Sequence, residues 1–201
     1  MCGAFEQHGI AMHQWAALLA DWPANDISRI NIRPTDMAAT LDARGYALRR
    51  WSLIPRWSND PKLKFATFNA RAETIAEKPT FRDAWRQSQR CIIPASAYFE
   101  WPVIEGDKQC HRLSREDGDA ILFGGLWETW QQAELKLETF TIITTAAATD
   151  IDWVHARTPL LIDAEHIDQW LTGSPEAAGK MLRPRVKSAL HVSAVPSAKD
   201  C

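Results

Sequence analysis

Short strand-like runs dominate this sequence and limit the folds open to it. They are rich in β-branched and aromatic residues and are separated by turn-forming residues. The runs cover residues 46–54, 91–101, 110–115, 120–130, 139–145 and 190–195. The REDGDA stretch between the third and fourth runs is typical of a hairpin turn, so neighbouring strands are expected to pair antiparallel.

Helix-like stretches are fewer and do not alternate regularly with the strands. Apolar residues at helical spacing predict helices over residues 12–22, 79–87 and 164–171, the last with Asp163 as N-cap and Gly173 beyond its end. We therefore predict an α+β fold. One domain would span the whole chain, with a curved, mostly antiparallel sheet forming a pseudo-barrel and a few peripheral helices.

The composition is that of an ordinary globular protein, with 46% hydrophobic and 24% charged residues among 201. No apolar run approaches the roughly 20 residues needed to cross a bilayer, and no secretory signal is visible. We expect a cytoplasmic monomer without a membrane partner, in the bacterial cytosol or nucleoid if the source is prokaryotic. Cysteines at positions 2, 91, 110 and 201 lack zinc-site spacing, so free thiols and no structural metal are expected.

The charge pattern leaves two interpretations open. A formal net charge of −2 argues against a protein that binds polyanions over its whole surface. Arginines interleaved with aromatics at residues 49–57, and the arginines of residues 71–90, would suit single-stranded nucleic acid, with cations on phosphates and rings on bases. The alternative, which composition alone favours, places the arginines on a solvated face and the tryptophans in the core.

The chain opens with MCGAF, so removal of Met1 would leave Cys2 with a free α-amine. An α-amine has a pKa of about 7.8 against about 10.4 for lysine, which makes it the better Schiff-base nucleophile at neutral pH. The thiol of the same residue can then close a five-membered thiazolidine ring on the imine carbon. Intramolecular attack of this kind reaches effective molarities of about 10⁵ M or more. On Cys2 alone, a small apolar residue in a terminal strand remains the alternative.

The FNARAET motif at residues 68–74 carries a second candidate. Asn69 and Arg71 point the same way if the segment is extended. An amide beside a guanidinium can hold a polar intermediate and an adjacent phosphate. A turn-forming asparagine with a surface arginine is the alternative.

Two further motifs carry acid–base candidates. RCIIPASAYFEW places Glu100 at the end of an apolar run, where a raised pKa would suit it to shuttle protons near neutral pH. DWVHARTPLLI places His155 two residues before Arg157, and these residue types serve as acid–base group and anion binder. An exposed strand-end glutamate and a structural histidine are the alternatives.

Taken in order, these motifs resemble the SOS response-associated peptidase family, also called abasic-site processing or SRAP proteins. The resemblance rests on nine motifs across roughly residues 1–162: MCG, NIRPT, WSLIPRW, NARAET, PTFRDAW, RCIIPASAYFEW, FGGLWETW, FTIITTAA and HARTPLLI. It implies a single α+β pseudo-barrel domain that binds single-stranded DNA containing an abasic site. It also implies covalent attachment through the N-terminal cysteine, with no metal or cofactor. The peptidase activity of the family name is self-removal of residues preceding the cysteine, here Met1.

The resemblance implies roles for four residues at the reacting centre. Cys2 would form the thiazolidine with the ring-opened aldehyde C1′, and Asn69 would hold the α-amine or the intermediate. Glu100 would move protons during ring opening and Schiff-base formation, and would assist reversal of the link. His155 would protonate the sugar oxygen and support strand-nicking elimination.

The resemblance also implies DNA contacts away from the reacting centre. Arg71 and Arg157 would bind phosphates flanking the lesion. Pro34 and the segment from Trp51 to Trp57 would line the DNA groove.

Two motifs depart from the family pattern. The family has MCGR where this chain has Ala4, which removes an expected phosphate contact and predicts weaker DNA affinity. The family motif H-D-R-M-P is HARTP here, so Ala156 and Thr158 replace the acidic neighbour and the methionine. His155, Arg157 and the following proline are retained, so the acid–base role is still expected.

Three other functions remain alternatives at this point. A class II glutamine amidotransferase also matures to an N-terminal Cys-Gly, but its His-Asn-Gly motif is absent from this sequence. A Cys-His protease would use Cys2 and His155 on other proteins. A non-catalytic module would bind single-stranded DNA without forming a covalent link.

Overall fold

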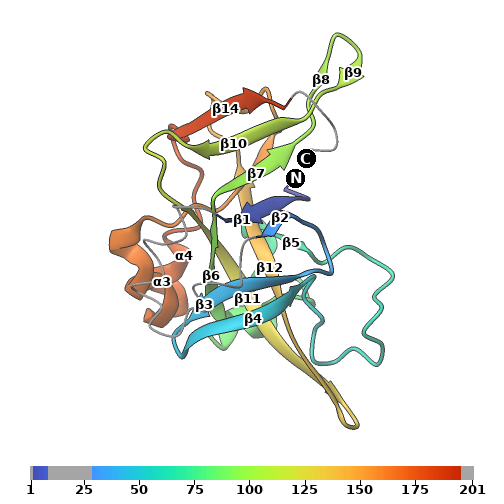
Figure 1. Cartoon of the computed structure of the whole chain (residues 1–201). Coiled ribbons are helices and arrows are strands. Elements are labelled where there is room, and N and C mark those ends of the chain that lie inside the picture. The colour runs from blue at the N-terminus through green and yellow to red at the C-terminus, as the bar shows by residue number, and fades with distance from the viewer. Residues whose placement is uncertain (1, 9–28, 196–201) are drawn as a thin grey trace.

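The computed structural model describes residues 2–8 and 29–195, and β-strands form most of it (Figure 1). The first sheet has the order β14-β10-β7-β1-β2, with β1 Phe5–Gln7, β2 Arg29–Ile32, β7 Ala97–Glu100, β10 His111–Arg115 and β14 Leu190–Ala194. The second sheet contains β3 Met37–Asp42, β4 Gly45–Trp51, β5 Asn69–Arg71, β6 Arg90–Ala95, β11 Ile121–Gln132, β12 Leu135–Ala146 and β13 Arg157–Pro159. A small hairpin joins β8 Val103–Ile104 to β9 Asp107–Lys108. The predicted helix over residues 12–22 lies outside the described residues.

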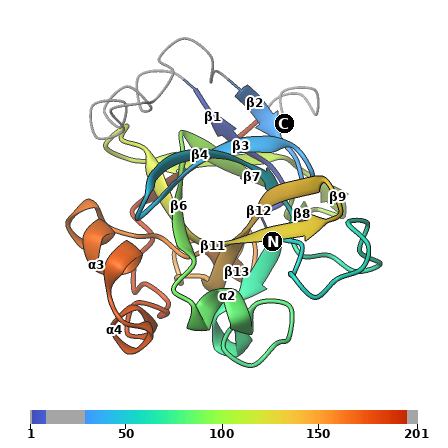
Figure 2. The ribbon, with the colours of Figure 1, turned by 90° about the horizontal axis from the view of Figure 1, so that it is seen from below.

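The second sheet closes on itself. Its pairings run from β11 through β6, β3, β4 and β12, and β12 pairs back with β11. Figure 2 shows these strands as a ring seen end-on. All the pairings are antiparallel except those of β12 with β4 and β5, which are parallel. The predicted α+β pseudo-barrel is therefore confirmed.

Alternating side chains of the barrel strands divide the apolar core in two. On β6, Cys91, Ile93 and Ala95 belong to one buried cluster, while Ile92 belongs to the other. This is the two-residue period of a strand with both faces covered. The first cluster also contains Cys2, so the start of the chain is packed into the main core.

Five short helical segments lie within residues 29–195: η1 Ala72–Thr74, α2 Arg82–Arg86, η2 Ala164–His166, α3 Ile167–Thr172 and α4 Pro175–Gly179. Helices α3 and α4 lie together outside the barrel (Figures 1 and 2). The predicted helix over residues 79–87 is present only as α2. The helix predicted over 164–171 begins as a 3₁₀ turn, and Asp163 makes no side-chain cap because its carboxylate pairs with Arg185 at 2.6 Å. Gly173 follows the end of α3, as predicted.

Two strand predictions need correction. The run over residues 91–101 is two strands in different sheets, because Ser96 leaves the ladder and bonds Glu6 through both its backbone N–H and its hydroxyl, at 2.9 and 3.1 Å. The REDGDA stretch is a turn, but it joins β10 in the first sheet to β11 in the second and so does not form a hairpin. Sequence pattern located both segments and missed their partners.

The cysteines differ from expectation at one position. Cys2 and Cys91 are buried free thiols, as predicted. Cys110 is disulfide-bonded, which corrects the expectation of free thiols throughout. Within the described ranges, no helix is both long enough and apolar enough to span a membrane.

Candidate active site

Four residues that the sequence singled out meet near the start of the chain. Cys2 lies just before β1, Asn69 opens β5, Glu100 ends β7, and His155 lies in the turn between β12 and β13. β1 pairs with β7, and β12 pairs with both β5 and β13. Strand pairing therefore draws together segments that are up to about 150 residues apart in the chain.

Asn69 makes the most direct contact in this group. Its side-chain Nδ2 donates a hydrogen bond to the backbone carbonyl of Cys2 at 2.8 Å. Its Oδ1 is buried and has no hydrogen-bond partner among the residues that the structure describes. A buried amide oxygen without a donor is costly, so it is a ready acceptor for an N–H group that arrives at the site.

Cys2 is fully buried, and this burial sets the state of its thiol. Burial raises the pKa of Cys2 well above its usual value, and the charge of Glu100 raises it further. The thiol also lies 3.6 Å from the carbonyl oxygen of Ala4, to which it can donate. At neutral pH the sulfur therefore carries its proton.

Glu100 is the carboxyl group whose charge acts on the Cys2 thiol. Its residue is 4% exposed, and burial raises the pKa of the carboxyl to about 7. In the sheet, Glu100 on β7 stands opposite His111 on β10. A carboxyl with this pKa can both accept and release a proton near neutral pH, as the apolar motif predicted.

His155 has one ring nitrogen fixed by its own turn. The backbone N–H of Arg157 lies 2.9 Å from Nδ1 and can donate to it, and the carbonyl oxygen of Arg157 lies 3.2 Å from the same atom, so the backbone of Arg157 engages Nδ1 in either tautomer. Burial lowers the pKa of His155, and the positive charge of the amino terminus lowers it too. That same terminal charge opposes the effect of burial on the pKa of Glu100.

The structure adds a pair of residues that the sequence analysis missed. The hydroxyls of Tyr98 and Thr158 lie 3.1 Å apart and join β7 to β13. Tyr98 precedes Glu100 by two residues and so shares its face of the strand, which was the available signal. Thr158 stands where the family pattern has methionine, and its hydroxyl supplies the partner for the buried Tyr98.

Comparison with known proteins identifies the family. The sequence pattern of the SOS response associated peptidase (SRAP) family matches residues 1–198. The chain belongs to the SRAP family. It is 34% identical over 163 residues to abasic site processing protein YoqW of Bacillus subtilis, covering 77% of this chain and 72% of YoqW. It is 32% identical over 191 residues to abasic site processing protein YedK of Escherichia coli, covering 90% and 82%.

Solved structures share this SRAP fold. A crystal structure of a protein from Bordetella bronchiseptica has a TM-score of 0.85 and 26% identity, covering 98% of this chain and all of the other. A protein from Bacteroides thetaiotaomicron has a TM-score of 0.84 and 23% identity, covering 96% and 92%. The pseudo-barrel is therefore shared by proteins that differ at about three quarters of their positions.

Ala4, the departure from the SRAP pattern beside the cysteine, lies at a packing position. Its side chain is fully buried in a small cluster with Phe99 and Cys110. Its carbonyl accepts the backbone N–H of Phe99 at 3.0 Å, which ties the start of β1 to β7. A small residue suits this position, and any phosphate contact on this side must come from other residues.

The two arginines expected at phosphates have different surroundings. Arg71 is exposed. Arg157 is paired with Glu73, with Nη1 to Oε1 at 2.6 Å and Nη2 to Oε2 at 2.8 Å, and it also donates to the carbonyl of Thr144. An anion that approaches Arg157 must therefore compete with a carboxylate of the same chain.

The residues expected to line a DNA groove are divided between surface and core. Trp57 is 50% exposed, with its indole N–H donating to the carbonyl of Pro79 at 3.1 Å, and Pro34 is half-buried. Trp51 is fully buried and stacks on Phe140 with ring centroids 6.3 Å apart. The prediction that Trp51 contacts DNA is wrong, because its ring is buried in the barrel core.

The basic clusters seen in the sequence are likewise divided. Arg49 is fully buried and donates to the carboxylates of Asp42 and Glu138. Arg90 is also buried and donates to the carbonyls of Trp170 and Gly173. Both arginines stabilise the fold and are unavailable to DNA. Across residues 2–8 and 29–195, no group of three or more His, Cys, Asp or Glu residues is placed to hold a metal ion.

Proposed function

We propose that this chain binds single-stranded DNA at an abasic site and forms a covalent thiazolidine crosslink through Cys2 once Met1 has been removed. The observation that carries the proposal is the hydrogen bond from Asn69 to the backbone of Cys2. The carboxyl of Glu100, whose pKa burial raises to about 7, acts on the same residue. The substrate is inferred from the relatives YoqW and YedK, which are named as abasic site processing proteins. The reaction requires no metal or cofactor.

The protonated state of the thiol supports a fixed order of steps. The α-amine of Cys2 attacks aldehyde carbon C1′ of the ring-opened abasic sugar, and loss of water gives an imine. The sulfur then adds to the imine carbon while the thiol proton passes to the nitrogen. The net products are the thiazolidine and one water, and the five-membered ring forms at high effective molarity.

The surrounding residues divide the proton and positioning work. Asn69 holds the Cys2 backbone, and its free Oδ1 accepts an N–H of the α-amine or of the intermediate. Glu100 takes and returns protons during ring opening, imine formation and reversal of the link. His155 presents Nε2 toward the sugar oxygen and supports the elimination that nicks the strand.

DNA contacts and maturation complete the proposal. Arg71 and Arg157 bind phosphates beside the lesion, and Pro34 and Trp57 line the groove. Removal of Met1 by the chain itself would account for the peptidase of the family name. The protein would act as a monomer in the cytoplasm.

The geometry argues against a Cys-His protease. Such an enzyme needs a thiolate beside an imidazolium, whereas burial raises the pKa of Cys2 and lowers that of His155. The Nδ1 atom of His155 is engaged by the backbone of Arg157. Each of these observations favours the amine-first reaction.

The test is adduct formation with a single-stranded oligonucleotide bearing one abasic site. Intact-mass measurement first establishes whether Met1 is absent from the purified protein. A denaturation-resistant adduct is expected, and Cys2→Ala abolishes it. Cys2→Ser keeps the α-amine, so it should give an adduct that survives only after borohydride reduction of the imine.

Substitutions of the acid–base residues separate chemistry from binding. Glu100→Gln and His155→Ala should slow adduct formation while leaving non-covalent DNA binding largely intact. If protein lacking Met1 gives no adduct but hydrolyses glutamine or an unrelated peptide, the proposed function is wrong.

A further inference from the structure

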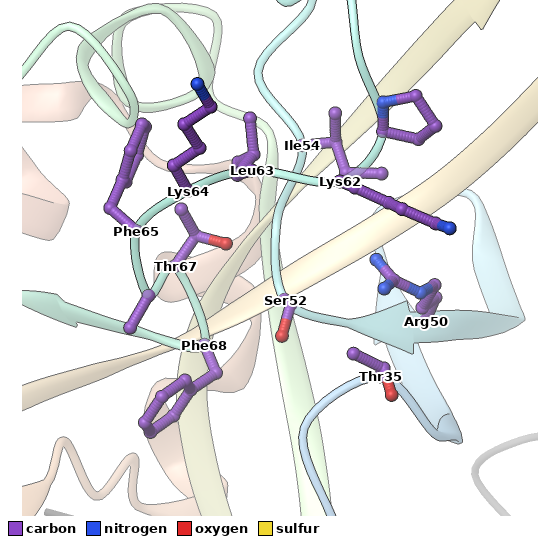
Figure 3. A pocket seen from close by; sticks show the side chains of 12 residues that line it. Thr35, Arg50, Ser52, Ile54, Lys62, Leu63, Lys64, Phe65, Thr67 and Phe68 are labelled. Atoms are coloured by element: carbon purple, nitrogen blue, oxygen red, sulfur yellow. The ribbon is translucent and has the colours of Figure 1, made fainter.

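A pocket of about 440 Å³ is lined by the loop that leads into β5, the strand that Asn69 opens (Figure 3). Phe68 lines it, and the next residue is Asn69, whose amide holds Cys2. The indole N–H of Trp51 donates to the carbonyl of Phe68 at 2.8 Å and fixes this end of the loop to the barrel core. Its volume lies within the usual range for small-ligand sites.

Three cations line the pocket without a carboxylate to neutralise them. They are Arg50, Lys62 and Lys64, and none makes an ion pair with any residue in the described part of the chain. Arg157, by contrast, is paired with Glu73. The pocket therefore carries uncompensated positive charge, which favours an anionic ligand.

The pocket also offers an aromatic surface. Phe65 is 51% exposed and lies across the pocket from Arg50 and Lys62 (Figure 3). An exposed phenylalanine ring beside unpaired lysines matches the two requirements of single-strand binding, a ring for a base and cations for phosphates.

Two of the residues that line this pocket have strained backbone conformations. Thr35 has φ of +85° and Ser52 has φ of +101°, and both line the pocket. Positive φ is unfavourable for a β-branched residue such as threonine, and strained residues cluster at ligand sites. The strain is held by hydrogen bonds from Thr35 N–H to the Trp51 carbonyl at 2.8 Å and from Ser52 N–H to the Phe140 carbonyl at 2.9 Å.

We infer that this pocket holds the nucleotide next to the abasic site on one side of the lesion. Its phosphate lies at Arg50, Lys62 and Lys64, and its base stacks on Phe65. The inference rests on the proposed function, because it presumes that the abasic sugar reaches Cys2. It assigns the phosphate contact on this side of the lesion to the loop that leads into β5.

The first test compares two variants that remove the same charge. Lys62→Gln/Lys64→Gln removes two pocket lysines, and Lys108→Gln/Lys136→Gln removes two exposed lysines on distant hairpins. Binding of single-stranded DNA is measured by fluorescence anisotropy from 50 to 200 mM salt. Only the pocket variant should lower the salt slope, by about 0.7 for the loss of one phosphate contact, so its affinity falls about 2.6-fold less than that of wild type over that range.

A second comparison tests the base contact. Phe65→Ala should weaken binding roughly five- to 150-fold, the range for loss of one stacked base. Leu135→Ala is the control, because Leu135 is 50% exposed at the far end of the β11–β12 hairpin. Its affinity should match that of wild type.

Two oligonucleotides, one with the abasic site at its 5′ end and one with the site at its 3′ end, separate this inference from the proposed function. Each keeps the flanking nucleotides on only one side of the lesion. The pocket variant should lose affinity only for the oligonucleotide that retains the flank filling the pocket. Equal behaviour of the two lysine variants overturns the pocket assignment and leaves the crosslink intact. Absence of any adduct from wild-type protein lacking Met1 overturns the proposed function instead.

Discussion

The side-chain amide of Asn69 donates a hydrogen bond to the backbone carbonyl of Cys2 over 2.8 Å. Asn69 opens β5, which pairs in parallel with β12, a long strand of the closed barrel. The barrel therefore fixes the residue that carries both proposed nucleophiles. Positioning of this kind contributes to rate, because a displacement of about 1 Å can cost 10²-fold.

Replacing this amide should slow the covalent step and spare binding. Asn69→Ala is expected to reduce the rate of adduct formation at saturating DNA by roughly 10- to 100-fold, since both the hydrogen bond and the positioning are lost. The rate is followed by denaturing gel, and DNA affinity by anisotropy. Asn59→Ala, at an exposed loop position, is the matched control and should react at the wild-type rate. Equal rates for the two variants would remove Asn69 from the reacting centre.

The raised pKa of Glu100 makes a prediction about stability. Burial moves the pKa from 4.5 to about 7, so between these values the folded state binds more protons than the unfolded state. Stability from this group therefore falls as pH rises from about 4.5 to 7. Glu100→Gln removes the penalty and should stabilise the protein at pH 8 by up to about 3 kcal/mol, with little gain at pH 4.5.

Chemical denaturation at several pH values measures this difference. Glu105→Gln is the control, because Glu105 is exposed in the β8–β9 turn and should show no such pH-dependent gain. A gain for Glu100→Gln that does not change between pH 4.5 and 8 would mean that the carboxyl is not held with a raised pKa.

The pairing of Glu73 with Arg157 predicts a variant with tighter DNA binding. Glu73→Gln keeps the shape of the side chain but frees the charge of Arg157 for a phosphate. Affinity for single-stranded DNA should rise a few-fold at low salt, and the salt slope should steepen by about 0.7. Glu77→Gln removes the same charge at an exposed neighbouring position and controls for net charge. If both variants bind equally, Arg157 does not meet the DNA.

The local sequence pattern predicts much of the fold. The alternation of Cys91, Ile92 and Ile93 is a strand pattern, and the barrel places these side chains in two separate clusters, as a strand covered on both faces requires. The break at Ser96 could not be predicted, because it depends on bonds to Glu6, 90 residues away. Closure through β11 and β12 is a non-local event of the same kind.

The candidate site shows the same division. Motif chemistry points to Cys2, Glu100 and His155, because each residue type suits one step of the proposed reaction. It does not predict the surroundings that tune them. The pairing of Arg157 with Glu73 joins residues 84 apart in the chain, and the contact of Tyr98 with Thr158 joins residues 60 apart.

The two tryptophans of the WSLIPRW motif provide a last prediction, because the structure places one in the core and the other at the surface. Trp51→Ala should destabilise the protein by about 3–5 kcal/mol, the usual cost of emptying a large core site. Trp57→Ala should cost only about 0.5–1.5 kcal/mol, the usual net value of the one hydrogen bond that it removes. If the ring of Trp57 stacks on a base, the same variant should weaken single-strand binding by about 1–3 kcal/mol. Denaturant titration and anisotropy on the same two proteins separate these effects, and a Trp57 variant with unchanged affinity would exclude this ring from the DNA groove.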